Sequence, residues 1–157
     1  MNVPCPGLLE TILKVPWHRF LGVQVEETRR GYARLRLPYR PDFAGNVSRG
    51  ALHGGVLAAL ADVCAIATLW TFCSPADRSS TVDLKVDYLR PAPLRDMLAE
   101  GEIRMLGNRL GNVAIYIRAA DAPERTVAEA RAVCYRIRGG AADTAVAYTA
   151  SAETVSV

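Results

Sequence analysis

The chain has 157 residues, of which 50% are hydrophobic and 22% are charged, and its formal net charge is +3. This composition excludes an intrinsically disordered chain, which is poorer in apolar residues and more highly charged. The mild charge and an aromatic content of 7% do not favour a nucleic-acid-binding protein, which needs a concentrated basic surface or stacking aromatics. We expect one domain over residues 1–157, with a core over about 22–137 and a tail over 139–157.

The four cysteines are dispersed and the chain has two histidines. This pattern predicts neither a disulfide framework nor a structural zinc site. The N-terminal stretch MNVPCPGLLE lacks the basic segment and apolar run of a secretory signal. We therefore expect a cytoplasmic protein with reduced thiols and no bound metal.

The first part of the chain predicts a short helix and a hairpin. Apolar residues at helical spacing predict a helix within 7–20, which Pro16 would end. Alternating apolar residues predict two strands, at 22–27 and 32–37. Residues 38–50 are rich in Pro, Asp, Gly, Asn and Ser, which indicates a loop.

The stretch ALHGGVLAALADVCAIATLW, residues 51–70, predicts one long apolar helix. A central Asp62 would cost about 2.5–3.5 kcal/mol in a bilayer, so we predict a buried helix and no membrane partner. Four strands follow, at 81–89, 97–106, 111–120 and 126–137. The order predicts an α+β fold in which an antiparallel sheet of about six strands wraps one long central helix.

Asp62 has no basic side chain within one helical turn, because its neighbours at three and four residues are Ala58, Ala59, Ala65 and Ile66. A buried carboxylate is normally satisfied by a hydrogen-bond donor. Asp62 therefore either accepts from a hydroxyl or amide of the sheet or of a second subunit, or it is available for catalysis.

The helix begins with His53, Gly54 and Gly55. Consecutive glycines let another molecule approach the free amides at the positive end of the helix dipole. Such a helix start is suited to a developing oxyanion. The alternatives are that the glycines only permit tight packing and that His53 is a structural hydrogen-bonding residue.

Three segments together carry a family resemblance: Asn46 with GALHGGVLAALAD at 50–62, TVDLKVDYLRP at 81–91, and LGNR at 106–109. Over about 22–137 the chain resembles the PaaI-like acyl-CoA thioesterases of the hotdog-fold superfamily. The resemblance implies a homodimer whose sheets join, commonly paired into a homotetramer, with the active site at the subunit interface.

The resemblance also implies roles for individual residues. The backbone amide of Gly54 would polarise the thioester carbonyl, and Asp62 of the neighbouring subunit would attack it or activate water. His53 and Asn46 would orient the thioester, and Thr81 would position the attacking water. The residues themselves leave the nucleophilic and general-base roles of Asp62 open.

Two positions depart from the family pattern. Asn46 lies one residue further from His53 than in the family, so Ser48 could take its role. Strand alternation places Thr81 on the face opposite a set of four residues: Val82, Leu84, Val86 and Tyr88. If that set packs on the chain's own helix, Thr81 has to act from the strand end or across an interface.

Coenzyme A would be part of the acyl-CoA substrate, so no separate cofactor is expected. Arg90, Arg109 and Arg49 are the candidate contacts of its phosphates, and Gly55 is a further candidate binding position. The resemblance is compatible with a small aromatic, short-chain or medium-chain acyl group.

Other functions compete with hydrolysis. Hotdog proteins also serve as non-catalytic acyl-CoA sensors or carriers, although the sensors usually attach a DNA-binding segment. Hotdog dehydratases and isomerases use a catalytic histidine in a different motif. Cys64 is a conceivable covalent nucleophile, but two residues along a helix from Asp62 it points in a different direction, and a buried thiol is usually inert.

Overall fold

The computed structural model describes residues 7, 12, 14–74 and 76–139, so the expected tail lies, apart from Gly139, outside the described residues. The described elements are α2 (Pro16–Leu21), β1 (Gln24–Arg29), β2 (Tyr32–Leu37), η1 (Pro41–Phe43), β3 (Ala44–Asn46), η2 (Val47–Arg49), β4 (Ala51–Leu52), α3 (Gly54–Trp70), β5 (Arg78–Tyr88), β6 (Met97–Leu106), β7 (Leu110–Ala119) and β8 (Ala122–Ile137).

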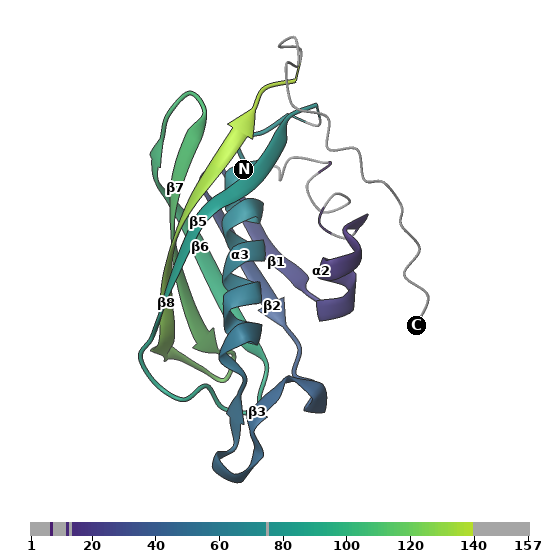
Figure 1. Cartoon of the computed structure of the whole chain (residues 1–157), viewed down its shortest axis with the longest axis vertical. Helices are drawn as coiled ribbons and strands as arrows, with labels where there is room; N and C mark the ends of the chain where they lie inside the picture. Colours follow the sequence, from purple (N-terminus) through teal and green to yellow (C-terminus); the bar gives the residue numbers. More distant parts are fainter. Residues whose placement is uncertain (1–6, 8–11, 13, 75, 140–157) are drawn as a thin grey trace, which may run out of the picture.

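A six-stranded antiparallel sheet with the order β1-β2-β6-β7-β8-β5 curves around α3 (Figure 1). The predicted α+β fold, with a short N-terminal helix, is therefore confirmed. Both end strands, β1 and β5, have one neighbour in this sheet. Within the described residues, no helix is long and apolar enough to cross a membrane.

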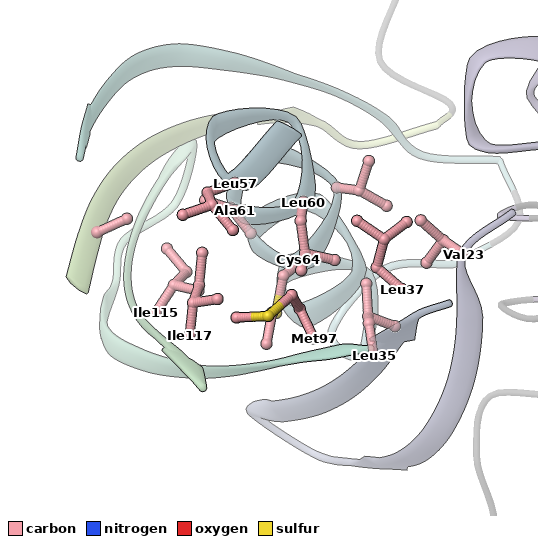
Figure 2. Packing of buried hydrophobic residues seen from close by; sticks show 14 of the residues in the cluster. Val23, Leu35, Leu37, Leu57, Leu60, Ala61, Cys64, Met97, Ile115 and Ile117 are labelled. Atoms are coloured by element: carbon pink, nitrogen blue, oxygen red, sulfur yellow. The ribbon is translucent and has the colours of Figure 1, made fainter. Parts of the chain in front are cut away.

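The core lies between α3 and the concave side of the sheet. Leu57, Leu60 and Cys64 project from α3 toward Met97 and Ile117 (Figure 2). Burying a leucine side chain contributes roughly 1.5–3 kcal/mol. The helix approaches β6 closely, because a methyl group at Gly101 would lie 2.2 Å from Thr68 Oγ1. This packing fixes the position of α3 against the sheet.

Two segments differ from the sequence expectations. Residues 12 and 14 are helical and residue 15 is a bend, so a helix stops before Pro16 as predicted, but Pro16 also begins the next helix, α2. A proline is well suited to the first helical position, where no intrahelical N–H bond is required. The segment 38–50, expected to be a loop, contains two short 3-10 helices and β3, which pairs with β4. We call residues 44–52 the 44–52 hairpin.

A β-bulge at Val82 changes the faces of β5. The pairing with β8 shifts between Thr81 and Asp83, so two residues of β5 oppose one residue of β8. Val82 is 62% exposed, while Thr81 contacts α3. The expectation that Thr81 lies on the face opposite Leu84 and Val86 is therefore wrong: the bulge turns Thr81 toward the chain's own helix, on the same side as these two residues.

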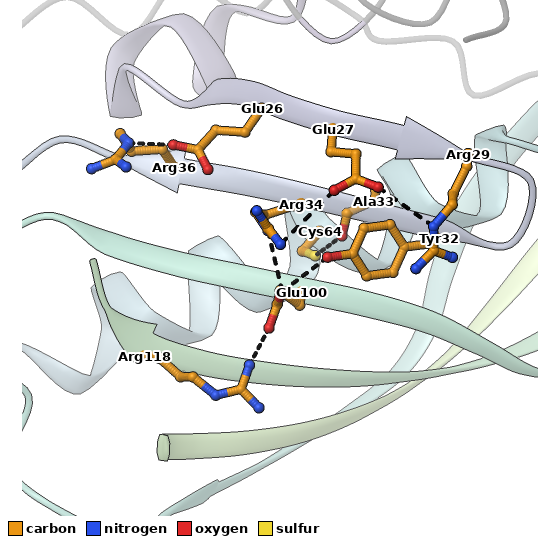
Figure 3. A network of polar contacts seen from close by, with 10 residues as sticks. All are labelled: Glu26, Glu27, Arg29, Tyr32, Ala33, Arg34, Arg36, Cys64, Glu100 and Arg118. Atoms are coloured by element: carbon orange, nitrogen blue, oxygen red, sulfur yellow. Dashed lines mark hydrogen bonds and ion pairs between the residues drawn. The ribbon is translucent and has the colours of Figure 1, made fainter. Parts of the chain in front are cut away.

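The convex face of the sheet carries a polar network centred on Glu100 (Figure 3). Its carboxylate accepts hydrogen bonds from Tyr32 Oη at 2.9 Å and Arg34 Nε at 3.2 Å, and it also pairs with Arg118. Burial and the neighbouring Glu100 raise the pKa of Tyr32 to about 12. The network ties β2, β6 and β7 together on the side of the sheet away from α3.

Candidate active site

The contact between α3 and β5, which we call the α3–β5 seam, brings several sequence candidates together. It contains three side-chain hydrogen bonds: Tyr88 Oη to Gly54 O at 3.0 Å, Thr81 Oγ1 to Asp62 Oδ1 at 2.6 Å, and Trp70 Nε1 to Ser79 Oγ at 2.5 Å. Three points along the whole helix are therefore tied to one edge strand.

Asp62 is half-buried in the middle of this seam. Its Oδ1 accepts the bond from the Thr81 hydroxyl, whereas Oδ2 has no hydrogen-bond partner within the described part of the chain. The described residues also provide no ion pair to Asp62. The carboxylate is thus held in place by one donor, with its second oxygen available to a reacting molecule.

Cys134 lies behind this pair, directly opposite Thr81 on the neighbouring strand. It is completely buried. Burial, with a further contribution from the Asp62 carboxylate, raises the pKa of the Cys134 thiol to about 11. The thiol therefore stays protonated at neutral pH and is an uncharged neighbour of Thr81 and Asp62.

Cys64, the alternative nucleophile, faces the core and not the seam. It is 0% exposed, and its Sγ lies 3.8 Å from Ala33 O. Burial raises the pKa of the Cys64 thiol to about 12. A thiol that is inaccessible and protonated is a poor nucleophile, so the geometry favours Asp62.

His53 is the N-cap of α3: its Nδ1 accepts a hydrogen bond of 2.9 Å from the Gly55 N–H. Because Nδ1 is an acceptor, this pattern assigns the proton of the neutral imidazole to Nε2. The Gly54 N–H donates to no acceptor among the described residues. The helix start therefore has two free donors, Gly54 N–H and His53 Nε2–H.

Steric contacts explain both glycines. A methyl group at Gly55 would lie 2.9 Å from His53 Nδ1, which is too close for the ring to keep its position. A methyl group at Gly54 would lie 3.3 Å from the ring of Tyr88. The two glycines thus permit tight packing, and of their two N–H groups only that of Gly54 is without an acceptor among the described residues.

Asn46 and Ser48 lie together in the 44–52 hairpin, at the N-terminal end of α3 (Figure 1). Asn46 Oδ1 accepts hydrogen bonds from Ser48 Oγ at 2.9 Å and from Arg49 N–H at 3.0 Å. The hairpin packs closely on the helix start, since a methyl group at Gly45 would lie 2.5 Å from His53 Cα. Both candidates for orienting the thioester are therefore at the same end of the helix as His53.

The three candidate arginines are not all at one end of the molecule. Arg90 follows β5 and donates to Thr126 O at 2.8 Å. The segment after Arg90 runs beside β4, because Leu52 N donates to Ala92 O. Arg90 and Arg49 therefore lie at the end of the molecule near His53. Arg109 lies at the opposite end of β5, where its carbonyl accepts from Arg136 N. At about 3.3 Å per residue these ends are roughly 30 Å apart.

Gly54 and Asp62 are also separated. Eight residues of α-helix rise about 12 Å, so one chain cannot place both the Gly54 N–H and the Asp62 carboxylate on the same carbonyl group. The half-buried or exposed side of α3 extends along this whole distance, through Gly55, Ala58, Ala59, Asp62, Ile66 and Trp70. A site that uses both groups requires a second copy of the chain.

Tyr88 and Cys134 are the site neighbours that sequence reasoning missed. Tyr88 belongs to the segment TVDLKVDYLRP, but its hydrogen bond to Gly54 joins residues 34 positions apart. No local sequence pattern predicts this contact. Cys134 resembles an ordinary core residue in an alternating strand. Only the register between β5 and β8 places it beside Thr81.

Comparison with known proteins assigns the family. The model of the thioesterase superfamily matches residues 49–126, the segment that contains His53, Asp62 and Thr81. A putative esterase of Halobacterium salinarum is 35% identical over 119 residues, which cover 71% of this chain and 78% of that protein. The chain belongs to the thioesterase superfamily.

Two further proteins agree with this membership. The chain is 30% identical to the medium/long-chain acyl-CoA thioesterase YigI of Escherichia coli over 112 residues, covering 63% of this thioesterase and 72% of YigI. The structure of the E. coli PaaI protein from the phenylacetic acid degradation operon superposes with a TM-score of 0.74 at 20% identity, covering 87% and 98% of the two chains. The resemblance to PaaI-like hotdog thioesterases is confirmed.

Proposed function

We propose that this thioesterase hydrolyses acyl-CoA to the free acid and CoA, with Asp62 as nucleophile or general base and the Gly54 N–H as oxyanion donor. The observation that supports this proposal best is the isolated Asp62 carboxylate, held by the 2.6 Å bond from Thr81 and without a cation partner in the described part of the chain. Thioester hydrolysis needs such a base or nucleophile beside an oxyanion site.

The chemistry follows from the free groups at the site. The thioester carbonyl oxygen accepts from Gly54 N–H at the positive end of α3, where negative charge on that oxygen is stabilised in the transition state. His53 Nε2–H is a second donor, and Asn46 or Ser48 orients the substrate from the 44–52 hairpin. Asp62 Oδ2 then attacks the carbonyl carbon and expels CoA thiolate, or it removes a proton from an attacking water. Thr81 holds the carboxylate in position.

We further propose that two copies build each site. β5 is an edge strand of 11 residues, and the unpaired backbone groups of such an edge favour pairing with another strand. Antiparallel pairing of two β5 strands would join the sheets and bring Asp62 of one copy toward the helix start of the other. A homotetramer would be formed by two such dimers.

The subunit arrangement also bears on CoA binding. Arg90 and Arg49 of one copy lie near the helix start, and an antiparallel partner would bring its own Arg109 end toward them. Phosphate groups are favourable partners for guanidinium groups. The substrate pocket is thereby expected at the junction of two chains, in a cytoplasmic protein in which Cys64 and Cys134 form no disulfide.

The acyl group is proposed to be small and aromatic or aliphatic and of short to medium length. The names of two similar proteins support different ends of this range: YigI is a medium/long-chain acyl-CoA thioesterase, and PaaI belongs to a phenylacetic acid degradation operon. A substrate panel therefore has to include both classes.

The experiment measures thiol release from benzoyl-CoA, phenylacetyl-CoA and short-chain and medium-chain acyl-CoAs by the wild type and by Asp62→Asn. We expect Asp62→Asn to lower kcat at least about 100-fold without changing the oligomer or the fold. Asp42→Asn is the matched control, because Asp42 is an exposed carboxylate of η1. If the wild type binds acyl-CoA without turnover, the proposed hydrolase function is wrong and the chain is an acyl-CoA-binding protein.

A single turnover in water enriched in heavy oxygen tests for direct attack by Asp62. If Asp62 is the nucleophile and water attacks the Asp62 carbonyl of the acyl-enzyme anhydride, the label enters the Asp62 carboxylate. Water that attacks the acyl carbonyl, or water that Asp62 activates, labels the released acid. Label found in Asp62 therefore demonstrates direct attack, and label found in the released acid alone excludes attack of water on the Asp62 carbonyl.

A further inference from the structure

Tyr88 is linked to His53 through a single peptide group. The Tyr88 Oη–H donates to the carbonyl oxygen of Gly54 at 3.0 Å, and the N–H of the same peptide group, which belongs to Gly55, donates to His53 Nδ1 at 2.9 Å. Hydrogen bonds on both sides of one amide polarise each other. The Tyr88 hydroxyl thereby strengthens the bond that fixes the His53 ring.

The ring of Tyr88 adds a steric contribution to the same contact. Its Cε1 and Cζ atoms would lie 3.3 Å from a methyl group placed on Gly54, so the ring packs directly over the first residue of α3. Tyr88 is the last residue of β5 and 53% of its surface is exposed. The strand end, the helix start and His53 therefore form one connected unit near the open end of the α3–β5 seam.

We infer that Tyr88 is a positioning residue for the helix start: it holds the Gly54–Gly55 peptide so that His53 keeps Nδ1 as an acceptor and presents Nε2–H as a donor. This inference rests on the proposed function and adds a residue to it. Tyr88 acts through the peptide and through His53. It touches neither the carboxylate of Asp62 nor, in the proposed mechanism, the reacting carbonyl group.

The Gly54 N–H belongs to the preceding peptide, so a fixed Gly54–Gly55 peptide also restrains the direction of this free donor. Loss of the Tyr88 hydroxyl would leave the peptide with one of its two side-chain bonds. The His53 ring could then rotate away from Gly55 N–H and populate the tautomer with its proton on Nδ1. The two outward donors would no longer have one fixed arrangement.

The first measurement is the tautomer of His53 by ¹⁵N NMR of the imidazole in the wild type and in Tyr88→Phe, which keeps the ring and removes only the hydroxyl. The chain has one other histidine, His18, whose Nδ1 lies 3.1 Å from Ile12 O and which serves as the internal reference. We expect a single Nε2–H tautomer for neutral His53 in the wild type and a mixture in Tyr88→Phe. An unchanged single tautomer would overturn the inference.

The second measurement is the kinetics of Tyr88→Phe against Tyr116→Phe. Tyr116 accepts a bond from Arg104 on the convex face of the sheet, so its variant removes a hydroxyl outside the site. We expect kcat to fall about threefold to tenfold in Tyr88→Phe, with KM changed less than about twofold, and no change in Tyr116→Phe. An unchanged kcat in Tyr88→Phe would reject the positioning role, even if the tautomer shifts.

The two measurements also separate this inference from the proposed function. An inactive wild type would contradict acyl-CoA hydrolysis, but the His53 tautomer would still show whether Tyr88 controls the imidazole. An active wild type with identical His53 signals in both proteins would retain the hydrolase and reject the link through the peptide.

Discussion

Thr81 donates a 2.6 Å hydrogen bond to Asp62 of its own chain, and it does so because the bulge at Val82 offsets the alternation of β5. A regular strand would direct Thr81 away from α3. The extra residue instead places Thr81, Leu84 and Val86 on the helix side and leaves Val82 exposed. The orientation of the candidate catalytic carboxylate thus depends on one inserted residue in an edge strand.

Replacement of Thr81 by valine should lower activity more than stability. Thr81→Val keeps the shape of the side chain but leaves Asp62 without its donor; a hydrogen bond to a charged group is worth about 1.5–3 kcal/mol. We expect kcat to fall about tenfold to 100-fold, and Thr81→Ser to recover most of the loss.

The control for this series is Ser80→Ala, at the exposed neighbouring position of β5. Steady-state thiol release gives kcat, and thermal unfolding reports the fold. Equal activity of Thr81→Val and the wild type would mean that Asp62 does not require this hydroxyl.

Replacement of Gly55 by alanine should separate catalysis from helix stability. The added methyl group would displace the His53 ring from 2.9 Å and remove the N-cap, which costs about 1 kcal/mol. Alanine recovers about 0.5–1 kcal/mol over glycine inside a helix. We therefore expect the melting temperature to change little while kcat falls.

His53→Asn is the matching variant for the cap. Asparagine keeps a good N-cap acceptor but lacks the outward Nε2–H donor. Reduced activity with normal stability in His53→Asn would assign the effect to the donor. Wild-type activity in both His53→Asn and Gly55→Ala would remove the His53 donor from the mechanism.

The sequence predicts the fold more completely than the site. Apolar alternation predicts β2 and β6 with their observed bounds, because the burial of every second residue of a strand against the core leaves a local pattern in the sequence. The bulge at Val82 and the contact of Gly45 with His53 depend on how distant segments pack. Asp62 was identifiable as a carboxylate without a neighbouring cation, whereas its bond to Thr81 required the register between β5 and β8.

Glu100 should make stability depend on pH on the acid side. Burial by itself would raise the pKa of Glu100, but the hydrogen bonds from Tyr32 and Arg34 and the charge of Arg118 outweigh burial and hold this pKa below its usual value. The unfolded state then binds the proton more readily than the folded state. The stabilisation is present above the usual carboxyl pKa and is lost as pH falls through the lowered pKa of the folded state.

Urea unfolding between pH 7 and pH 3 measures this contribution. At pH 7 we expect Glu100→Gln to unfold at a lower urea concentration than the wild type, because its free energy of unfolding is lower by about 1–2 kcal/mol. On acidification we expect this variant to lose less stability than the wild type. Glu124→Gln, at an exposed position of β8, is the control. Parallel pH profiles for the wild type and Glu100→Gln would show that this carboxylate does not contribute.

Mixing two inactive variants should restore activity if each site is shared between two chains. Because Gly54 and Asp62 are about 12 Å apart along the helix, a site that uses both groups would combine the helix start of one copy with Asp62 of the other. In a mixed dimer of Asp62→Asn and His53→Ala, one site contains both substitutions and the other contains neither. Random exchange of equal amounts yields half mixed dimers, so we expect recovery of about one quarter of the wild-type activity. Sites built within single chains would give no recovery, because every chain then carries one defect.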